Sequence, residues 1–205
     1  MISNIIESIL ILLILLFSIV VHELAHGYMA YYLGDPTAKY SDRLSLNPLK
    51  HLDLLGSIIL PLTMLLSSFY TGPIIGWAKP VPINPYNFKD QKWGILKVSL
   101  AGPLANFLLA IICSLFNLII IKIFHNSFLS FGINLIIFYN LNWGIFNLIP
   151  LSPLDGFNIL STFLGEKTPK FLVQYELYIL MFLLFFTNFD YYLLLITNFL
   201  FRILT

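Results

Sequence analysis

The pentapeptide His22-Glu23-Leu24-Ala25-His26 combines residue types and spacing that suit metal chemistry. Residues four apart in a helix lie one turn apart on one face, so both imidazoles can bind the same ion. Neutral imidazole is a good ligand for zinc, and a carboxylate beside the metal can take a proton from water. The pattern H-E-x-x-H therefore predicts a hydrolytic zinc centre with His22 and His26 as ligands and Glu23 as the general base.

The motif lies inside an apolar stretch that runs from Ile9 to Leu33. Ionisable side chains are costly in a bilayer, so three of them within five residues indicate a function. In a chain of this composition, chance produces the pattern only about two times in a thousand. The alternative is that the histidines are structural and only form hydrogen bonds within a helix bundle. That alternative would suit a single histidine better than this group of three ionisable residues.

The composition is that of an integral membrane protein. Hydrophobic residues make up 59% of the 205 residues and charged residues only 10%, whereas soluble domains carry about a quarter charged residues. The net charge of +1 gives no reason to expect a nucleic acid as a partner. Cys113 is the only cysteine, which excludes an intramolecular disulfide and a thiolate cluster. We therefore expect a multi-pass protein of the cell membrane, surrounded by the lipid bilayer.

The apolar segments predict an all-α polytopic membrane protein with about five to six transmembrane helices. The first segment is expected to be retained, because no basic residue precedes Lys39 and no small-residue cleavage site follows it. The six segments are Ile5 to Leu33, Leu54 to Phe69, Ile95 to Phe124, Phe131 to Ile149, Phe171 to Thr187 and Tyr191 to Leu204.

The second segment, Leu54 to Phe69, is short, contains Pro61 and precedes the Pro/Gly-rich stretch Tyr70 to Pro85. If it crosses the membrane, four basic residues fall on one side and seven on the other; if it re-enters, ten of the eleven share one side. The positive-inside rule favours the second arrangement. It predicts an external N-terminus and a site toward the cytoplasm, although the segment is almost long enough to span.

The third zinc ligand is expected just after the fourth apolar segment, which breaks at Pro150 at the depth of His26. A catalytic zinc needs three protein ligands and an open position. Asp155 is the only carboxylate between Asp90 and Glu166, which makes it the best candidate. The remaining candidates lie too far along the first helix, in or beside later spans, or near segment ends: Glu7, Glu176, Asp190, His51 and His125.

Together these residues resemble the site-2 protease family of intramembrane zinc metalloproteases. His22 to His26 matches the first family motif, and Asn147 to Gly156 matches the second, N-x-x-P-x-x-P-L-D-G. Ala101 to Asn106 resembles the small-residue stretch on the helix packed against the site. The resemblance covers residues 1–165, expected to form the protease core, and residues 166–205 are expected to form a C-terminal helical hairpin. From its length we expect a minimal form of the family, without a PDZ or nucleotide-sensing domain.

The resemblance implies one zinc ion per chain, held by His22, His26 and Asp155, with Glu23 as general base and acid. It also implies that Asn147 donates a hydrogen bond to the substrate carbonyl or its oxyanion. For Asn106, a role at the site and a hydrogen bond between helices both remain open.

The stretch Gly76 to Pro85 resembles an extended element of the family that lies between the first two motifs. An extended edge can pair with an unwound substrate, although its prolines donate no hydrogen bonds. The alternative is a proline-rich connector anchored at the interface by Trp77.

The expected activity is hydrolysis of peptide bonds in or near transmembrane segments of membrane proteins, whose helix must unwind to expose a carbonyl. One alternative is a non-proteolytic, zinc-containing membrane binding or chaperone-like protein. Another is a small transporter with a broken helix at Pro150 to Pro153, but no second broken segment is evident. A regulatory partner is compatible with the sequence, which does not identify one.

Overall fold

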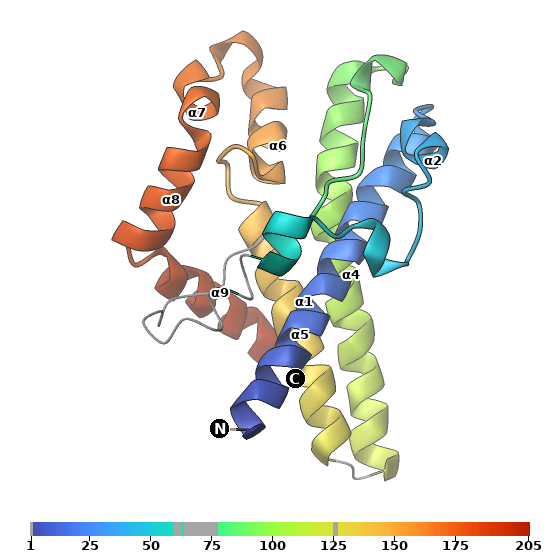
Figure 1. The fold of residues 1–205 in the computed structure, drawn as a ribbon, viewed down its shortest axis with the longest axis vertical. Helices are drawn as coiled ribbons and strands as arrows, with labels where there is room; N and C mark the ends of the chain where they lie inside the picture. The colour runs from blue at the N-terminus through green and yellow to red at the C-terminus, as the bar shows by residue number, and fades with distance from the viewer. Residues whose placement is uncertain (1, 60–62, 64–77, 125–126) are drawn as a thin grey trace.

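The computed structural model describes residues 2–59, 63, 78–124 and 127–205, and within these ranges the chain is helical, without strands (Figure 1). Short turns of 3-10 helix lie at Pro48–Lys50, Pro85–Asn87 and Gly165–Lys167, and a π-helical turn at Leu54–Ile59. The α-helices are α1 (Ile2–Tyr32), α2 (Thr37–Tyr40), α4 (Gln91–Phe124), α5 (Ser127–Asn147), α6 (Asp155–Leu164), α7 (Lys170–Gln174), α8 (Glu176–Phe186) and α9 (Phe189–Leu204).

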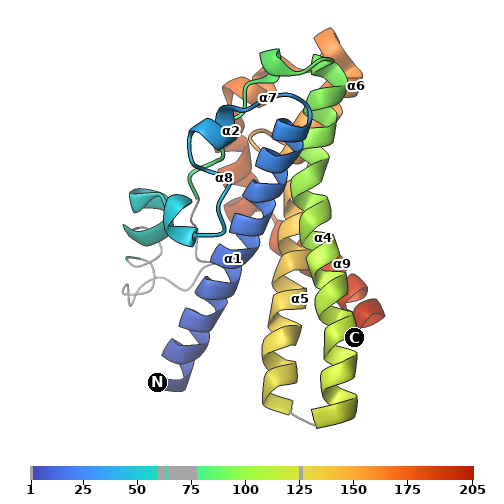
Figure 2. The same cartoon turned by 90° about the vertical axis from the view of Figure 1, so that its right-hand side faces the viewer.

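The three long helices α1, α4 and α5 form the centre of the molecule, and α4 packs against both of the others (Figure 2). Ile133, Ile137 and Leu141 of α5 are buried against Ala110 of α4, and the end of α9 packs against this cluster. A small residue allows the close approach of α4 and α5. A Cβ on Gly144 would lie 2.8 Å from the ring of Phe107.

Three helical segments are long and apolar enough to cross a membrane: Ile9–Tyr32, Gln91–Lys122 and Leu129–Asn147. The pair α8 and α9 adds a fourth span only if it is counted as one broken span, because the helices are bent by 78°. The described residues therefore contain three or four candidate spans, and the predicted number of five to six is not confirmed. Many apolar side chains of α4 are exposed, as expected where a helix faces lipid.

The end of α1 and the start of α4 lie at one end of the bundle, and the start of α1, the end of α4 and the start of α5 lie at the other (Figures 1 and 2). The chain therefore leaves α1 and enters α4 at the same end of the bundle. The predicted segment Leu54 to Phe69 lies mostly outside the described residues, as do Gly76 and Trp77 of the predicted extended element. Its described start, Leu54–Ile59, is the π-helical turn.

Candidate metal centre

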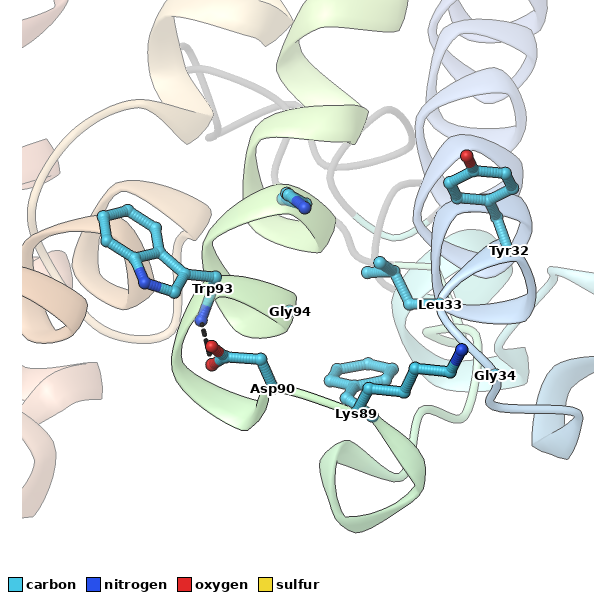
Figure 3. Close-up of a pocket in the computed structure, with 9 residues that line it drawn as sticks. Tyr32, Leu33, Gly34, Lys89, Asp90, Trp93 and Gly94 are labelled. Atoms are coloured by element: carbon cyan, nitrogen blue, oxygen red, sulfur yellow. Dashed lines mark hydrogen bonds between the residues drawn. The ribbon is translucent and has the colours of Figure 1, made fainter.

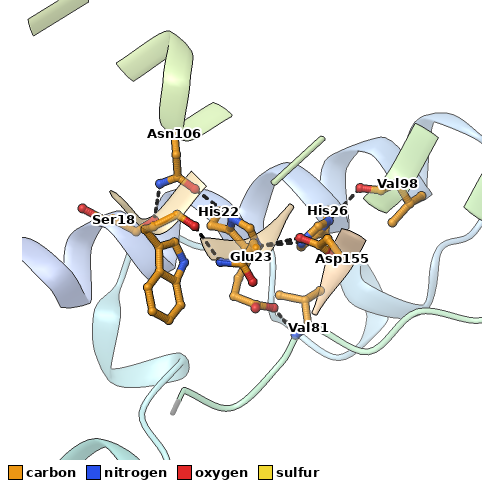
Figure 4. A network of polar contacts seen from close by, with 10 residues as sticks. Ser18, His22, Glu23, His26, Val81, Val98, Asn106 and Asp155 are labelled. Atoms are coloured by element: carbon orange, nitrogen blue, oxygen red, sulfur yellow. Dashed lines mark hydrogen bonds and ion pairs between the residues drawn. The ribbon is translucent and has the colours of Figure 1, made fainter. Parts of the chain in front are cut away.

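His22 and His26 on α1 meet Asp155 at the first position of α6 (Figure 4). One ligand atom from each side chain lies within 4.8 Å of the other two. The two Nε2 atoms are 3.0 Å apart, and Oδ2 of Asp155 lies 3.0 Å from Nε2 of His22 and 3.2 Å from that of His26. Both imidazoles are buried and the aspartate nearly so. The structure therefore brings together the three side chains that the sequence singled out as a metal set.

The outer nitrogen of each imidazole contacts a hydrogen-bond acceptor. Nδ1 of His22 lies 2.8 Å from Oδ1 of Asn106, and Nδ1 of His26 lies 2.7 Å from the carbonyl oxygen of Val98. The orientation of the Asn106 amide is defined, because its Nδ2 donates to the carbonyl of Ser18 and to Oδ1 of Asn140. Both Nδ1 atoms are therefore assigned as donors, and a neutral imidazole with this tautomer has its lone pair on Nε2.

This proton assignment tests whether the three residues fit a metal ion. With neutral imidazoles, two nitrogen lone pairs and a carboxylate oxygen face one another, and the buried Oδ2 of Asp155 has no other hydrogen-bond partner among the described residues. Such a set is repulsive unless a cation lies among its members. Two neutral nitrogens and one carboxylate oxygen form a donor set that suits zinc. The residues present therefore fit the expected ion.

A glycine on α4 provides the space beside the imidazoles. A Cβ on Gly102 would lie 2.5 Å from Nε2 of His26 and 2.6 Å from Cε1 of His22. Pro103, the next residue, has no N–H to continue the helical hydrogen bonds, near the point where the carbonyl of Val98 accepts from His26. The small-residue stretch noted in the sequence therefore borders the imidazoles directly.

Asp155 is positioned by a sharp break between α5 and α6. Pro150 and Pro153 cannot continue α5, which ends at Asn147, and α6 begins at Asp155 itself. A Cβ on the next residue, Gly156, would overlap the carbonyl oxygen of Leu148. Glycine at this position therefore allows α6 to start against the end of α5 and to direct Asp155 toward α1.

Glu23 occupies the flank of α1 next to the two histidines and is half-buried. Its Oε2 accepts a hydrogen bond of 2.8 Å from the backbone N–H of Val81, which lies in an extended stretch before α4 (Figure 4). Among the described residues, no hydrogen bond is formed by Oε1. One carboxylate oxygen is thus fixed, and the other is available for chemistry.

Asn147 is buried at the end of α5, and its Nδ2 donates to the carbonyl of Trp143 at 3.0 Å. Within the described part of the chain, its hydrogen bond stays on its own helix and does not reach the metal set. Trp143 itself contacts His22 edge to face, with ring centroids 6.4 Å apart. Trp143 belongs to no motif, so sequence reasoning did not single it out.

The other acidic and histidine candidates lie apart from the metal set. Glu176 accepts a hydrogen bond from the hydroxyl of Ser152, and His51 is buried with Nε2 against the carbonyl of Ser45. Asp190 is exposed at the start of α9. The side chains of Glu7 and His125 fall outside the described residues.

Sequence reasoning missed two buried charged side chains near the end of α1. Asp35 accepts hydrogen bonds from Thr37, Asn84 and Asn87, and Arg43 donates to the carbonyl of Lys79. Burial alone would raise the pKa of Asp35, but these hydrogen bonds outweigh it and hold the pKa below its usual value. Neither residue belongs to a motif, and burial of charge was the signal that only the structure could give.

A surface pocket of about 530 Å³ lies where α1 ends and α4 begins (Figure 3). Tyr32, Lys89 and Trp93 are among the residues that line it, and all three are exposed. Asp90 caps α4 there by accepting from the N–H of Trp93 at 3.1 Å. None of the metal-set residues lines this pocket, so it is separate from the centre.

Comparison with known proteins identifies the family of this chain. Residues 117–187 match Peptidase family M50. The Bacillus subtilis (strain 168) protein named "Putative zinc metalloprotease YwhC" is 39% identical over 171 residues, which cover 80% of this chain and 73% of that protein. The chain belongs to peptidase family M50. It is accordingly a zinc metalloprotease and, with its apolar helices, a multi-pass membrane protein.

Two further M50 relatives are longer. Proteins named "Putative zinc metalloprotease Rip2" match from Mycolicibacterium smegmatis, at 30% identity, and from Mycobacterium tuberculosis, at 26%. The matches cover 76% and 82% of this chain, but only 57% and 62% of those relatives. No solved structure matches the chain.

Proposed function

We propose that this M50 protein is an intramembrane zinc metalloendopeptidase, which hydrolyses peptide bonds in or near transmembrane segments of membrane proteins. The observation that carries the proposal is that Asp155 meets His22 and His26, which lie on a candidate span of 24 residues. His26 precedes Tyr32, the last residue of α1, by six residues, which is about 9 Å along the helix axis. The site would therefore lie within the membrane, near one surface.

His22, His26 and Asp155 are the proposed ligands of one zinc ion per chain. When bound, zinc would supply a Lewis acid that polarises a peptide carbonyl and makes water more acidic. The hydrogen bonds from the two Nδ1 atoms would fix the orientation of the imidazoles and the tautomer that presents each Nε2 to the metal. The two histidines need no proton transfer of their own in this scheme.

Glu23 is the proposed proton carrier. Its carboxylate would take a proton from the attacking water and deliver it to the nitrogen of the departing amine, so no acyl-enzyme forms. The N–H of Val81 holds Oε2, which leaves Oε1 to accept this proton. We also propose that Asn147 uses the second hydrogen of its Nδ2 to bind the substrate carbonyl, because the first is donated to Trp143.

The proposed location is the cell membrane, with the site open toward the cytoplasm. The chain leaves α1 and enters α4 at one end of the bundle, and five described basic residues lie between these helices: Lys39, Arg43, Lys50, Lys79 and Lys89. Lys122 lies at the opposite end of α4. This distribution agrees with the positive-inside rule. A substrate helix would have to unwind to present its carbonyl, because a helical carbonyl is already hydrogen-bonded.

Cleavage of a panel of single-span substrates by the purified, detergent-solubilised protein tests the proposal. The test compares wild-type protein, Glu23→Gln, zinc-chelated protein and the exposed control Glu166→Gln. Cuts within an apolar span that disappear with Glu23→Gln and with chelation, but persist in the control, would support it. Full activity of Glu23→Gln with zinc bound would exclude the assigned base. Tightly bound zinc without cleavage of any substrate would favour the non-proteolytic binding protein.

A further inference from the structure

Residues 79–84, here called the strap, run in an extended conformation past α1, which carries the His22 to His26 motif and is here called the motif helix. Their sequence, Lys-Pro-Val-Pro-Ile-Asn, favours this conformation before any tertiary contact forms. Pro80 and Pro82 have a fixed φ near −65°, and each disfavours a helical conformation in the residue before it. Lys79 and Val81 are those preceding residues. Val81 is therefore held extended and has the only N–H between the two prolines.

Three of the four backbone N–H groups in the strap have identified acceptors. Lys79 donates to the carbonyl of His51 at 2.9 Å, Val81 to Oε2 of Glu23 at 2.8 Å, and Asn84 to Oδ2 of Asp35 at 2.7 Å. The bond to Glu23 thus lies between two anchoring bonds. The two anchors define where the N–H of Val81 points.

Each end of the strap is held by a buried charged side chain. At the first end, Nη2 of Arg43 donates to the carbonyls of Lys79 at 2.6 Å and Pro80 at 3.3 Å. At the other end, the fully buried Asp35 receives the N–H of Asn84 and also Nδ2 of Asn87 at 2.7 Å. Charge-assisted hydrogen bonds of this kind are stronger than neutral ones, so both anchors are firm.

The strap also packs directly against the motif helix. A Cβ on Gly27, the residue after His26, would lie 3.0 Å from Cγ1 of Val81 and 2.6 Å from Cδ2 of Leu44. Val81 is 5% exposed. The strap therefore approaches α1 at the one position of this turn that has no side chain, next to the proposed metal ligands.

From these contacts we propose that Arg43 and Asp35 are positioning residues for catalysis, which hold the strap so that the N–H of Val81 fixes the carboxylate of Glu23. The inference rests on the proposed role of Glu23 as the base. Neither Arg43 nor Asp35 contacts the metal set in the described structure. Their effect passes through the backbone of the strap, and a small misplacement of a catalytic group lowers kcat strongly.

Hydrogen–deuterium exchange of the full-length, detergent-solubilised protein tests the anchors without any need for proteolysis. Among the strap amides of wild-type protein, Lys79, Val81 and Asn84 should exchange slowly. Arg43→Gln and Asp35→Asn should each speed exchange at Val81 by at least about tenfold, because the donor loses its fixed position. The exposed, matched controls Lys39→Gln and Asp42→Asn should leave exchange unchanged. Slow exchange at Val81 in both anchor variants would overturn the proposal.

Steady-state cleavage kinetics test the consequence for Glu23. Arg43→Gln should lower kcat by about tenfold to a hundredfold, with KM and bound zinc unchanged. Arg43→Lys is the milder variant, because it keeps the charge but loses the guanidinium fork, and should retain an intermediate kcat. A raised KM with unchanged kcat would overturn the positioning role and would mean that the strap binds substrate instead.

Hydrogen exchange and cleavage kinetics together distinguish a failure of the positioning role from a failure of the proposed function. If wild-type protein cleaves no substrate but exchange at Val81 responds to Arg43 and Asp35, the anchors hold and the proposed function fails. If cleavage depends on Glu23 while the anchor variants keep full kcat, the proposed function holds and the positioning role fails.

Discussion

His22 and Asn106 share a hydrogen bond of 2.8 Å that joins the motif helix to α4 and determines which imidazole nitrogen is free for a metal. Asn106 can accept there only because its amide nitrogen is already committed to Ser18 and Asn140. Of the two roles that the sequence leaves open for Asn106, the hydrogen bond between helices is present, and the role at the site stays a prediction. Its hydrogen bonds join α1, α4 and α5, and the bond to His22 lies on the side of the imidazole ring away from the proposed metal.

Replacement of Asn106 by leucine should weaken zinc binding by about tenfold to a hundredfold, because the imidazole of His22 loses the acceptor that fixes its tautomer. Zinc affinity measured by competition with a chelator gives the change. Asn117→Leu is the matched control, since Asn117 is also a buried asparagine of α4 but contacts Asn134 instead. Equal losses in the two variants would mean that helix packing, rather than the orientation of His22, sets the affinity.

Gly102→Ala should disrupt the metal centre, because the added methyl group would lie 2.5 Å from Nε2 of His26. We expect a loss of bound zinc and destabilisation by about 1–3 kcal/mol, as for other overpacked cores. Zinc content and thermal unfolding of the purified protein measure both effects. Gly132→Ala in α5 has nothing within 4 Å of the new Cβ and should keep full zinc content. Normal zinc content in Gly102→Ala would show that α4 can move away from α1.

The local parts of the site were predictable from the sequence, because their geometry depends on short spacing. The i,i+4 spacing of His22 and His26 fixes a shared helix face, and the two prolines that end α5 place Asp155 at a break. Asp35 and Arg43 could not be identified in this way. Their partners, Asn84 and Lys79, are 49 and 36 residues away, and only tertiary packing brings them together.

For the membrane spans too, the sequence predicts the local features but not those that depend on tertiary structure. Apolar runs located α1, α4 and α5, although α4 begins at Gln91, before the predicted Ile95, because Asp90 caps its polar first turn. The C-terminal runs were predicted as two separate spans. The structure divides that region into the 11-residue α8 and the 16-residue α9, bent by 78°. Hydropathy reports the depth preference of residues, but it does not report a bend.

The stability of the protein should depend on Asp35 at acidic pH. Its pKa is lowered in the folded state, so the ionised carboxylate stabilises the fold above the ordinary pKa of about 4, and this contribution disappears as the pH falls below that value. Thermal unfolding between about pH 3 and 6 should therefore depend less on pH in Asp35→Asn than in wild-type protein. Asp42→Asn, an exposed change on the other side of the short helix α2, should leave the dependence intact. A parallel pH dependence for wild type and Asp35→Asn would contradict the expectation.

Removal of zinc should destabilise the protein, because the lone pairs of His22 and His26 and the carboxylate of Asp155 then face one another without a cation. Free zinc at a hundred times its dissociation constant would contribute about 2.7 kcal/mol to the free energy of unfolding. Thermal unfolding with chelator, and again after zinc is restored, measures this contribution. Asp155→Asn should abolish most of the response, whereas Asp190→Asn, at an exposed position of α9, should preserve it. A full zinc response in Asp155→Asn would remove Asp155 from the proposed ligand set.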